Sequence, residues 1–337
     1  MKYIVQFLNK YEKIASFQVY ENILYLLSNN KLHVITKDII LKHDFNSSSL
    51  YLYKGKVFSG KNFYYDVETN EINLINELKD YYYTNVFFGN YLIFSNLDMV
   101  IYSMESKKIE LVFPFKEDCG LTIIHNNISI FRGDDYYEGY LLENTEYSIW
   151  QQSFTDLLQS EEVLLRYYYV YQEKLILHLR TNGLPQNKYV SIVLDVNTGK
   201  ELYRTEETLG KKLIDGLGYT LYDQNLWISN PETYEVKRID LSETLFPLNK
   251  IIDDKIGDVD LGKTEVKFRF SPTYFSVEYP YLYFSQERGL QVGVLNIETK
   301  ELVFHTEIEE KGLVKDLKSS NGKFFVHTTE NDLYVFG

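Results

Sequence analysis

The sequence contains a single alanine, Ala15, among 337 residues. Alanine is the strongest helix former, so its near absence argues against a helical protein. The chain is instead rich in residues that favour strands, with 31 tyrosines and 21 phenylalanines beside many isoleucines, valines and leucines. The composition therefore predicts an all-β protein in which helices are rare.

Further absences bear on compartment and partners. No apolar run approaches the roughly 18 residues that a membrane helix needs, and residues 1–10 alternate like a strand rather than a signal peptide. Cys119 is the only cysteine, which excludes an intrachain disulfide and a thiolate metal cluster. A formal net charge of −13 disfavours the phosphate contacts of nucleic-acid binding. We expect a cytoplasmic protein, without membrane or nucleic-acid partners, whose partner is a basic protein.

A turn motif recurs along the chain. Asp, Asn or Ser opens it and Thr or Ser stands three residues later, and such side chains accept hydrogen bonds from nearby backbone amides in tight turns. Clear copies are residues 66–71 (DVETNE), 103–108 (SMESKK), 195–201 (DVNTGKE), 230–235 (NPETYE) and 296–301 (NIETKE), and weaker ones are residues 36–38 and 144–146. Most copies are spaced by roughly 35 to 40 residues, the length of a propeller blade.

Each interval has room for four short strands, the outer strand of one blade and the three inner strands of the next. Seven turns and the chain end predict eight blades, and seven is the alternative because the strands near residues 213–223 are tightly spaced. We expect residues 2–8 to pair with residues 332–336, because this pairing completes the last blade and leaves no open edge. The chain is predicted to be one domain over residues 1–337, with insertions at about residues 153–163 and 242–263.

The stretch LDVNTGKEL, residues 194–202, and its relatives resemble the repeats of the quinoprotein-like and WD40-like propellers, over the whole chain. This resemblance implies a β-propeller of four-stranded blades. The chain has Trp150 and Trp227 but no Gly-His and Trp-Asp pairs, and it lacks the regular tryptophan pattern of quinoprotein dehydrogenases. A pyrroloquinoline cofactor is therefore not implied.

Four irregular segments, residues 133–138, 153–163, 181–187 and 242–263, are assigned by strand alternation to one face of the propeller. Three of them are acidic, with net charges of −3, −3 and −2 for the first, second and fourth. Variable loops on a rigid scaffold commonly carry binding, and aromatic anchors in a polar rim are typical of protein interfaces. The predicted partner-binding residues are Asp134, Asp135, Tyr136, Tyr137, Phe154, Glu161, Glu162, Phe246, Asp253 and Asp254.

Two interpretations of these loops remain open. The apolar residues are anchors for a partner, or they pack the insertions back onto the sheets, in one case as a short helix. The acidic residues, correspondingly, contact a partner or only keep the surface soluble.

Patterns that would indicate catalysis are weak. Asp258-Val-Asp260-Leu-Gly262 only partly matches a calcium loop, because glycine replaces the third ligand. The six histidines show no metal-binding spacing, and no Gly-x-Ser-x-Gly elbow occurs. We therefore predict a monomeric, non-enzymatic, protein-binding propeller without cofactor or metal. A concrete version is an immunity protein or inhibitor that neutralises a toxin; the alternatives are a polysaccharide lyase, a glycoside hydrolase, or a glycan or small-molecule sensor.

Overall fold

The computed structural model is all-β, and the chain divides into two compact units that are treated separately. Unit 1 comprises Met1–Leu50 and Asp215–Gly337, and unit 2 comprises Tyr51–Ile214. The structure describes residues 5–36, 40–45, 47, 49–53, 55–59, 62–88, 91–95, 98–114, 120–125, 128–141, 147–160, 162–171, 173–181, 188–204, 218–222, 225–230, 235–240, 252–255, 259–260, 267–268, 270–286, 290–308 and 312–337.

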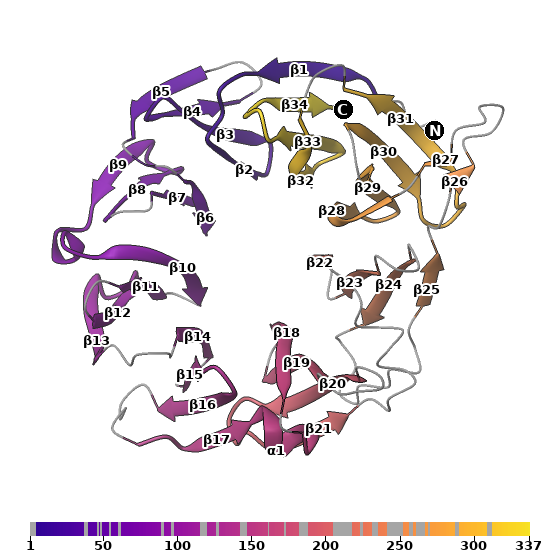
Figure 1. Cartoon of the computed structure of the whole chain (residues 1–337). Coiled ribbons are helices and arrows are strands. Elements are labelled where there is room, and N and C mark those ends of the chain that lie inside the picture. The colour runs from indigo at the N-terminus through magenta and orange to yellow at the C-terminus, as the bar shows by residue number, and fades with distance from the viewer. Residues whose placement is uncertain are drawn as a thin grey trace. The chain divides into compact units, whose positions relative to one another are not determined.

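The described strands of unit 1 form four antiparallel sheets of four strands and one two-stranded sheet (Figure 1). The first sheet contains β2 (Ser16–Tyr20), β3 (Ile23–Ser28), β4 (Lys31–Ile35) and β5 (Ile40–Asp44). The second contains β22 (Gly218–Tyr222), β23 (Asn225–Asn230), β24 (Glu235–Asp240) and β25 (Ile252–Lys255). The third contains β28 (Phe270–Glu278), β29 (Tyr281–Gln286), β30 (Gln291–Asn296) and β31 (Leu302–Glu307). The fourth contains β32 (Val314–Ser320), β33 (Lys323–Thr328), β34 (Leu333–Phe336) and β1 (Phe7–Tyr11). The two-stranded sheet contains β26 (Val259–Asp260) and β27 (Lys267–Phe268).

The described strands of unit 2 form four more antiparallel sheets of four strands. These are β6 (Tyr51–Tyr53), β7 (Lys56–Phe58), β8 (Phe63–Asp66) and β9 (Glu71–Leu74); β10 (Tyr82–Phe88), β11 (Tyr91–Ser95), β12 (Asp98–Ser103) and β13 (Lys108–Pro114); β14 (Gly120–His125), β15 (Ile128–Arg132), β16 (Tyr136–Leu141) and β17 (Trp150–Ser153); and β18 (Val163–Tyr171), β19 (Lys174–Thr181), β20 (Lys188–Asp195) and β21 (Glu201–Arg204).

Helical structure among the described residues is limited to α1 (Phe154–Leu158) and the 3₁₀ turn η1 (Asn76–Leu78). Neither has the length that a membrane crossing requires, and the described residues contain no other helix. The all-β class expected from the alanine content is therefore confirmed.

The core of each unit lies between successive sheets. In unit 1, Trp227 packs with Phe284 of the next sheet, Tyr283 packs with Phe324, and Phe17 packs with Phe325. Inner strands are buried on both faces, as in β33, where every residue after Lys323 is buried. Outer strands such as β5 and β1 are mostly exposed. This gradient explains why the second and third strands read as continuous apolar runs in the sequence.

The recurring turn has the chemistry expected from its sequence. Asp195 Oδ1 accepts hydrogen bonds from the backbone amides of Asn197 at 3.0 Å and Thr198 at 2.8 Å, and Asn296 Oδ1 makes the equivalent bonds to Glu298 and Thr299. The fifth residue is left-handed in four copies, with φ of 59° at Asn70, 54° at Lys107, 64° at Gly199 and 60° at Lys300. Each of these four turns joins the third and fourth strands of its sheet.

The copy at residues 230–235 differs from the prediction. It connects β23 to β24, the second and third strands of their sheet, and residues 241–251 connect the third strand to the fourth. An Asx-type turn can close any antiparallel hairpin, so the motif alone does not identify which hairpin it closes.

The N-terminal strand pairs with the last strand of the chain, in a different range from that predicted. β1 begins at Phe7, and its partners are Phe336 for Phe7, Tyr334 for Lys10 and Leu333 for Tyr11. The backbones of Gln6 and Gly337 exchange two hydrogen bonds of 3.0 Å. The described pairing therefore covers residues 7–11 rather than the predicted residues 2–8, and the rings of Phe7 and Phe336 lie 5.8 Å apart between centroids.

Candidate functional site

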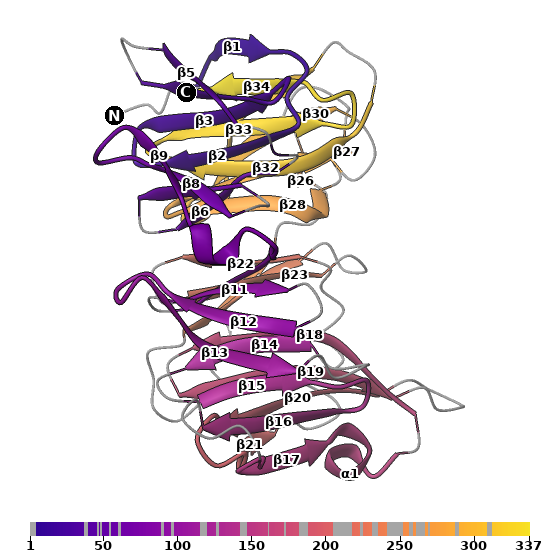
Figure 2. The ribbon, with the colours of Figure 1, turned by 90° about the vertical axis from the view of Figure 1, so that its left-hand side faces the viewer.

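The segment after β17 forms α1, the α-helix among the described residues of unit 2 (Figure 2). The short turn before β16 and the segment after β17 meet here, since Tyr136 is paired with Ser153 in the sheet. The amide of Phe154 donates to the carbonyl of Asp135 at 2.7 Å, and the Ser153 hydroxyl accepts from the Asp156 amide at 3.5 Å as the N-cap of the helix. Two loops separated in sequence thus form one hydrogen-bonded surface.

The helix is anchored by residues that were predicted to contact a partner. Phe154 is 0% exposed and Tyr137 is 0% exposed, and both belong to the core shared by the β14–β17 and β18–β21 sheets. Their rings meet edge to face at 5.6 Å between centroids. For Phe154 and Tyr137 the packing interpretation therefore holds, because both side chains are covered by the core and not presented to a partner.

Burial also sets the chemistry of the Tyr137 phenol. Its hydroxyl has no hydrogen-bond partner among the described residues, and burial raises its pKa well above the ordinary value of a tyrosine. A neutral phenol in this environment serves packing rather than acid–base chemistry.

The outward side of the same elements is acidic. Asp134, Asp135, Asp156 and Glu162 are all exposed, while Tyr136 is half-buried. Leu164 at the start of β18 is 44% exposed. We refer to these six residues, Asp134, Asp135, Tyr136, Asp156, Glu162 and Leu164, as the α1 surface.

Two members of the α1 surface, Asp156 and Leu164, were missed by sequence reasoning. The signal for Asp156 was present, because Phe154 and Leu157 lie three residues apart on the buried side of a helix and leave Asp156 outside. One basic residue, Arg132, is exposed beside Gly133 and offsets part of the charge. Glu161, which was also predicted, lies outside the described residues.

The second predicted loop, residues 242–263, has a different organisation from that expected. Asp253 and Asp254 lie in β25, where their backbones pair with Lys237 and Val236 of β24. Phe246 lies outside the described residues. Because residues 241–251 connect the third and fourth strands, they are not the fourth-to-first connection that placed this loop on a common face with residues 133–138.

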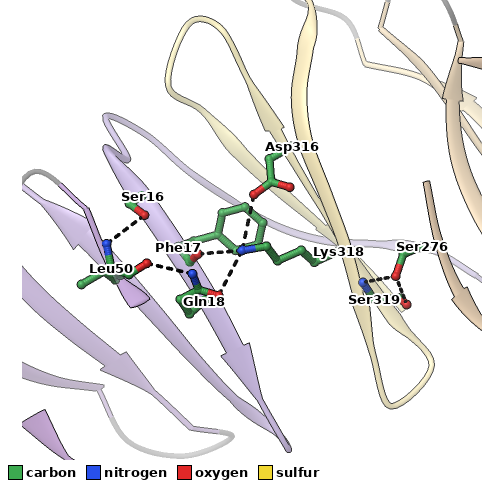
Figure 3. Close-up of polar contacts among 8 residues, drawn as sticks. All are labelled: Ser16, Phe17, Gln18, Leu50, Ser276, Asp316, Lys318 and Ser319. Carbon is green, nitrogen blue, oxygen red and sulfur yellow. Dashed lines mark hydrogen bonds and ion pairs between the residues drawn. The ribbon is translucent and has the colours of Figure 1, made fainter. Parts of the chain in front are cut away.

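A row of polar contacts joins the first strands of successive sheets in unit 1 (Figure 3). The Lys318 ammonium donates to Phe17 O at 3.2 Å and to Gln18 Oε1 at 3.0 Å, and it lies 3.4 Å from Asp316 Oδ2. The Ser276 and Ser319 hydroxyls are 2.7 Å apart.

The Lys318 ammonium thus makes two hydrogen bonds and is already paired with a carboxylate, which disfavours an anionic ligand there. The amide of Gln18 and the hydroxyl of Ser16 also bond the backbone of Leu50. We interpret the row as a structural link between strands rather than a binding site.

Two histidines are buried in second strands. Burial lowers the pKa of His178 to about 4. Burial likewise lowers the pKa of His327 to about 4, and its Nε2 lies 2.8 Å from the carbonyl of Ile14. Both rings are neutral near pH 7. Within the described part of the chain, no group of three or more His, Cys, Asp or Glu residues is placed to hold a metal ion.

Comparison with known proteins identifies the fold. Neither a family model nor a curated protein matches the chain. BamB from Moraxella catarrhalis is similar with a TM-score of 0.53 at 9% identity, over 99% of each chain. The β-propeller domain of Cps50 (Swd1) from Myceliophteria thermophila is similar with a TM-score of 0.54 at 10% identity, also over 99% of each chain. The chain therefore has the fold of a β-propeller, a fold that serves many functions.

Proposed function

We propose that this chain is a non-enzymatic β-propeller that binds a protein partner with basic character through its α1 surface. The observation that carries the proposal is the hydrogen bond from Phe154 N to Asp135 O, with the Phe154 ring fully buried beneath it. This arrangement holds the acidic turn and the helix in one geometry. A rigid surface loses little conformational entropy when a partner binds.

The charges of the α1 surface suit a cationic partner. Asp134 and Asp135 are exposed, and they stand in a chain whose net charge is −13. Negative charge concentrated at one place steers a basic protein toward it and raises the association rate, an effect that salt screens. Tyr136, the next residue after Asp135, supplies aromatic area beside these acids, and Leu164 at the start of β18 is a further exposed apolar side chain; interfaces combine such groups with a polar rim.

We further infer the architecture and setting of this binding protein. The eight four-stranded sheets would be eight blades of a single domain, with the β1–β34 pairing as the closure between the two ends of the chain. The protein would act as a monomer in the cytoplasm. A toxin with a positively charged active site is the kind of partner that its acidic surface would block.

The test compares matched pairs of charge reversals within unit 2. Asp134→Lys with Asp135→Lys alters the α1 surface, and Glu68→Lys with Glu71→Lys makes the same charge change on an exposed repeated turn. Proteins retained by the wild type from extracts of the native host at low salt would be identified, purified and measured for binding to all three proteins.

The expected result is that the partner binds the turn variant like the wild type and loses affinity for the α1 variant, with the difference shrinking as salt is raised. Equal affinity for both variants, or loss only in the turn variant, would show that the α1 surface is not the interface. Loss of binding that does not respond to salt would contradict the electrostatic part of the proposal.

A further inference from the structure

An arginine in unit 1 is held between two aromatic rings. Arg238 of β24 lies opposite Trp227 of β23 in the sheet, and its guanidinium carbon is 5.5 Å from the centroid of the Trp227 ring. The same carbon is 5.9 Å from the ring of Tyr279, in the turn between β28 and β29 of the neighbouring sheet. Trp227 is buried, whereas Tyr279 is 44% exposed. The guanidinium thus lies within cation–π distance of both rings, at a place that solvent reaches.

The stacking leaves hydrogen-bond donors unused. Arg238 makes no hydrogen bond or ion pair with any residue in the described part of the chain, although a guanidinium carries five N–H donors. The indole Nε1 of Trp227, the residue paired with Arg238 across the two strands, is buried without an acceptor among the described residues. A buried donor without an acceptor costs stability and calls for an explanation.

Two carboxylates on the neighbouring sheet, on either side of Tyr279 in the β28–β31 region, are already engaged. Glu298 accepts a hydrogen bond from the Tyr279 hydroxyl at 2.8 Å, and Glu278 accepts one from the amide of Gly322 at 2.9 Å. Both carboxylates are therefore bound to donors other than Arg238.

We propose that Arg238 is an oxyanion-binding residue that takes a carboxylate or phosphate group of a small molecule or peptide. A guanidinium presents two parallel N–H donors that match the spacing of two oxygens on such a group. Cation–π contacts with Trp227 and Tyr279 favour one placement of the guanidinium, so less entropy is lost when the anion binds. This site is distinct from the α1 surface and does not depend on the function proposed for it.

The experiment uses acetate and inorganic phosphate as probes on the full chain. Each is titrated against chloride at constant ionic strength near pH 7, while the arginine Nε–Hε and tryptophan indole signals are followed by NMR. The matched control is Arg204, whose guanidinium is already bound to the Glu201 carboxylate at 2.9 and 2.7 Å. Arg238→Gln removes the charge, and Arg238→Lys keeps a charge without the paired donors.

We expect the Arg238 signal to shift saturably with at least one anion, at a dissociation constant on the order of millimolar, while the Arg204 signal stays unchanged. Arg238→Lys should bind roughly tenfold more weakly, since one hydrogen bond of the pair is lost. Saturation with phosphate alone would assign a phosphate ligand, and saturation with acetate alone a carboxylate. No saturable shift with either anion, or equal shifts at Arg204, would overturn the proposal. If Arg238→Gln does not fold, Arg238→Lys provides the comparison.

Discussion

Replacing Gly139 by alanine should push a methyl group into the indole ring of Trp150. A Cβ atom at Gly139 would lie 2.4 Å from Trp150 Nε1 and 2.5 Å from Cε2, closer than van der Waals contact allows. Trp150 extends from β17 to the next sheet, where its Nε1 donates to the Val196 carbonyl at 2.9 Å. The Trp150–Val196 hydrogen bond therefore links two sheets of unit 2. Its loss should lower the free energy of unfolding, which can be measured.

The magnitudes follow from packing and hydrogen bonding. Gly139→Ala should destabilise by about 1–3 kcal/mol, because it overpacks a buried site. Trp150→Ala should cost about 3–5 kcal/mol, since it opens a cavity and leaves the Val196 carbonyl without its donor. In the double variant the new methyl group enters the space that the indole has left. The two changes together should therefore cost less than their sum, by about 1–3 kcal/mol.

Gly199→Ala is the informative control. A Cβ atom there would also meet the Trp150 ring, at 2.6 Å, but Gly199 has a φ of 64°. Removing the ring should relieve the clash and leave the conformational cost of about 1–2 kcal/mol for a residue with positive φ. Rescue by Trp150→Ala should thus be partial for Gly199→Ala and larger for Gly139→Ala.

Urea unfolding followed by far-UV circular dichroism measures all five variants, because this signal does not depend on the tryptophan that is changed. Trp150→Phe provides an additional point, with an expected cost of about 1–2 kcal/mol from the lost hydrogen bond. If the free-energy costs of Gly139→Ala and Trp150→Ala were strictly additive, the clash with the Trp150 ring would not be the cause of the Gly139→Ala destabilisation.

Three further predictions concern the chain end, pH and binding kinetics. Deleting residues 1–11 should lower the melting temperature, because it removes β1 and exposes the edge of β34; an unchanged melting curve would show that β1 adds nothing to stability. Burial lowers the pKa of His178 to about 4, so below about pH 6.5 the unfolded chain binds a proton that the folded chain does not. The free energy of unfolding should therefore fall by up to about 3 kcal/mol as the pH drops from about 6.5 toward 4. The same pH series on His178→Gln should show a shallower loss, and an identical slope would contradict this assignment. For a partner of the α1 surface, Asp134→Lys with Asp135→Lys should mainly slow association, whereas Tyr136→Ala should mainly accelerate dissociation, by about 2 kcal/mol if the ring is central; stopped-flow kinetics separates the two.

The sequence predicted features that depend on neighbouring residues. The turn at Asp195 is one, because its acceptor and both amide donors lie within three residues of each other. The all-β class is another, since it follows from composition. The pairing of an N-terminal strand with the last strand was also predicted, although over residues 2–8 and not the observed residues 7–11.

Features that depend on which face of an element becomes buried were less accessible. Tyr136 and Tyr137 are adjacent and chemically identical, yet the first is half-buried and the second is 0% exposed. Successive strand residues point to opposite faces, so a shift of one residue in register would exchange their roles. The sequence indicated an aromatic pair beside two acids but could not assign the outward ring.

What the sequence determined by itself was the local chemistry: strand-forming composition, turns closed by side chains a few residues away, and the acidic charge of the loops. Only the tertiary structure decided which hairpin the turn at residues 230–235 closes, that Phe154 is covered by the next sheet, and that Arg238 stacks between Trp227 and Tyr279. The physical reason is distance along the chain. Tyr279 follows Arg238 by 41 residues, and no pattern in a single sequence specifies such a contact before the sheets pack.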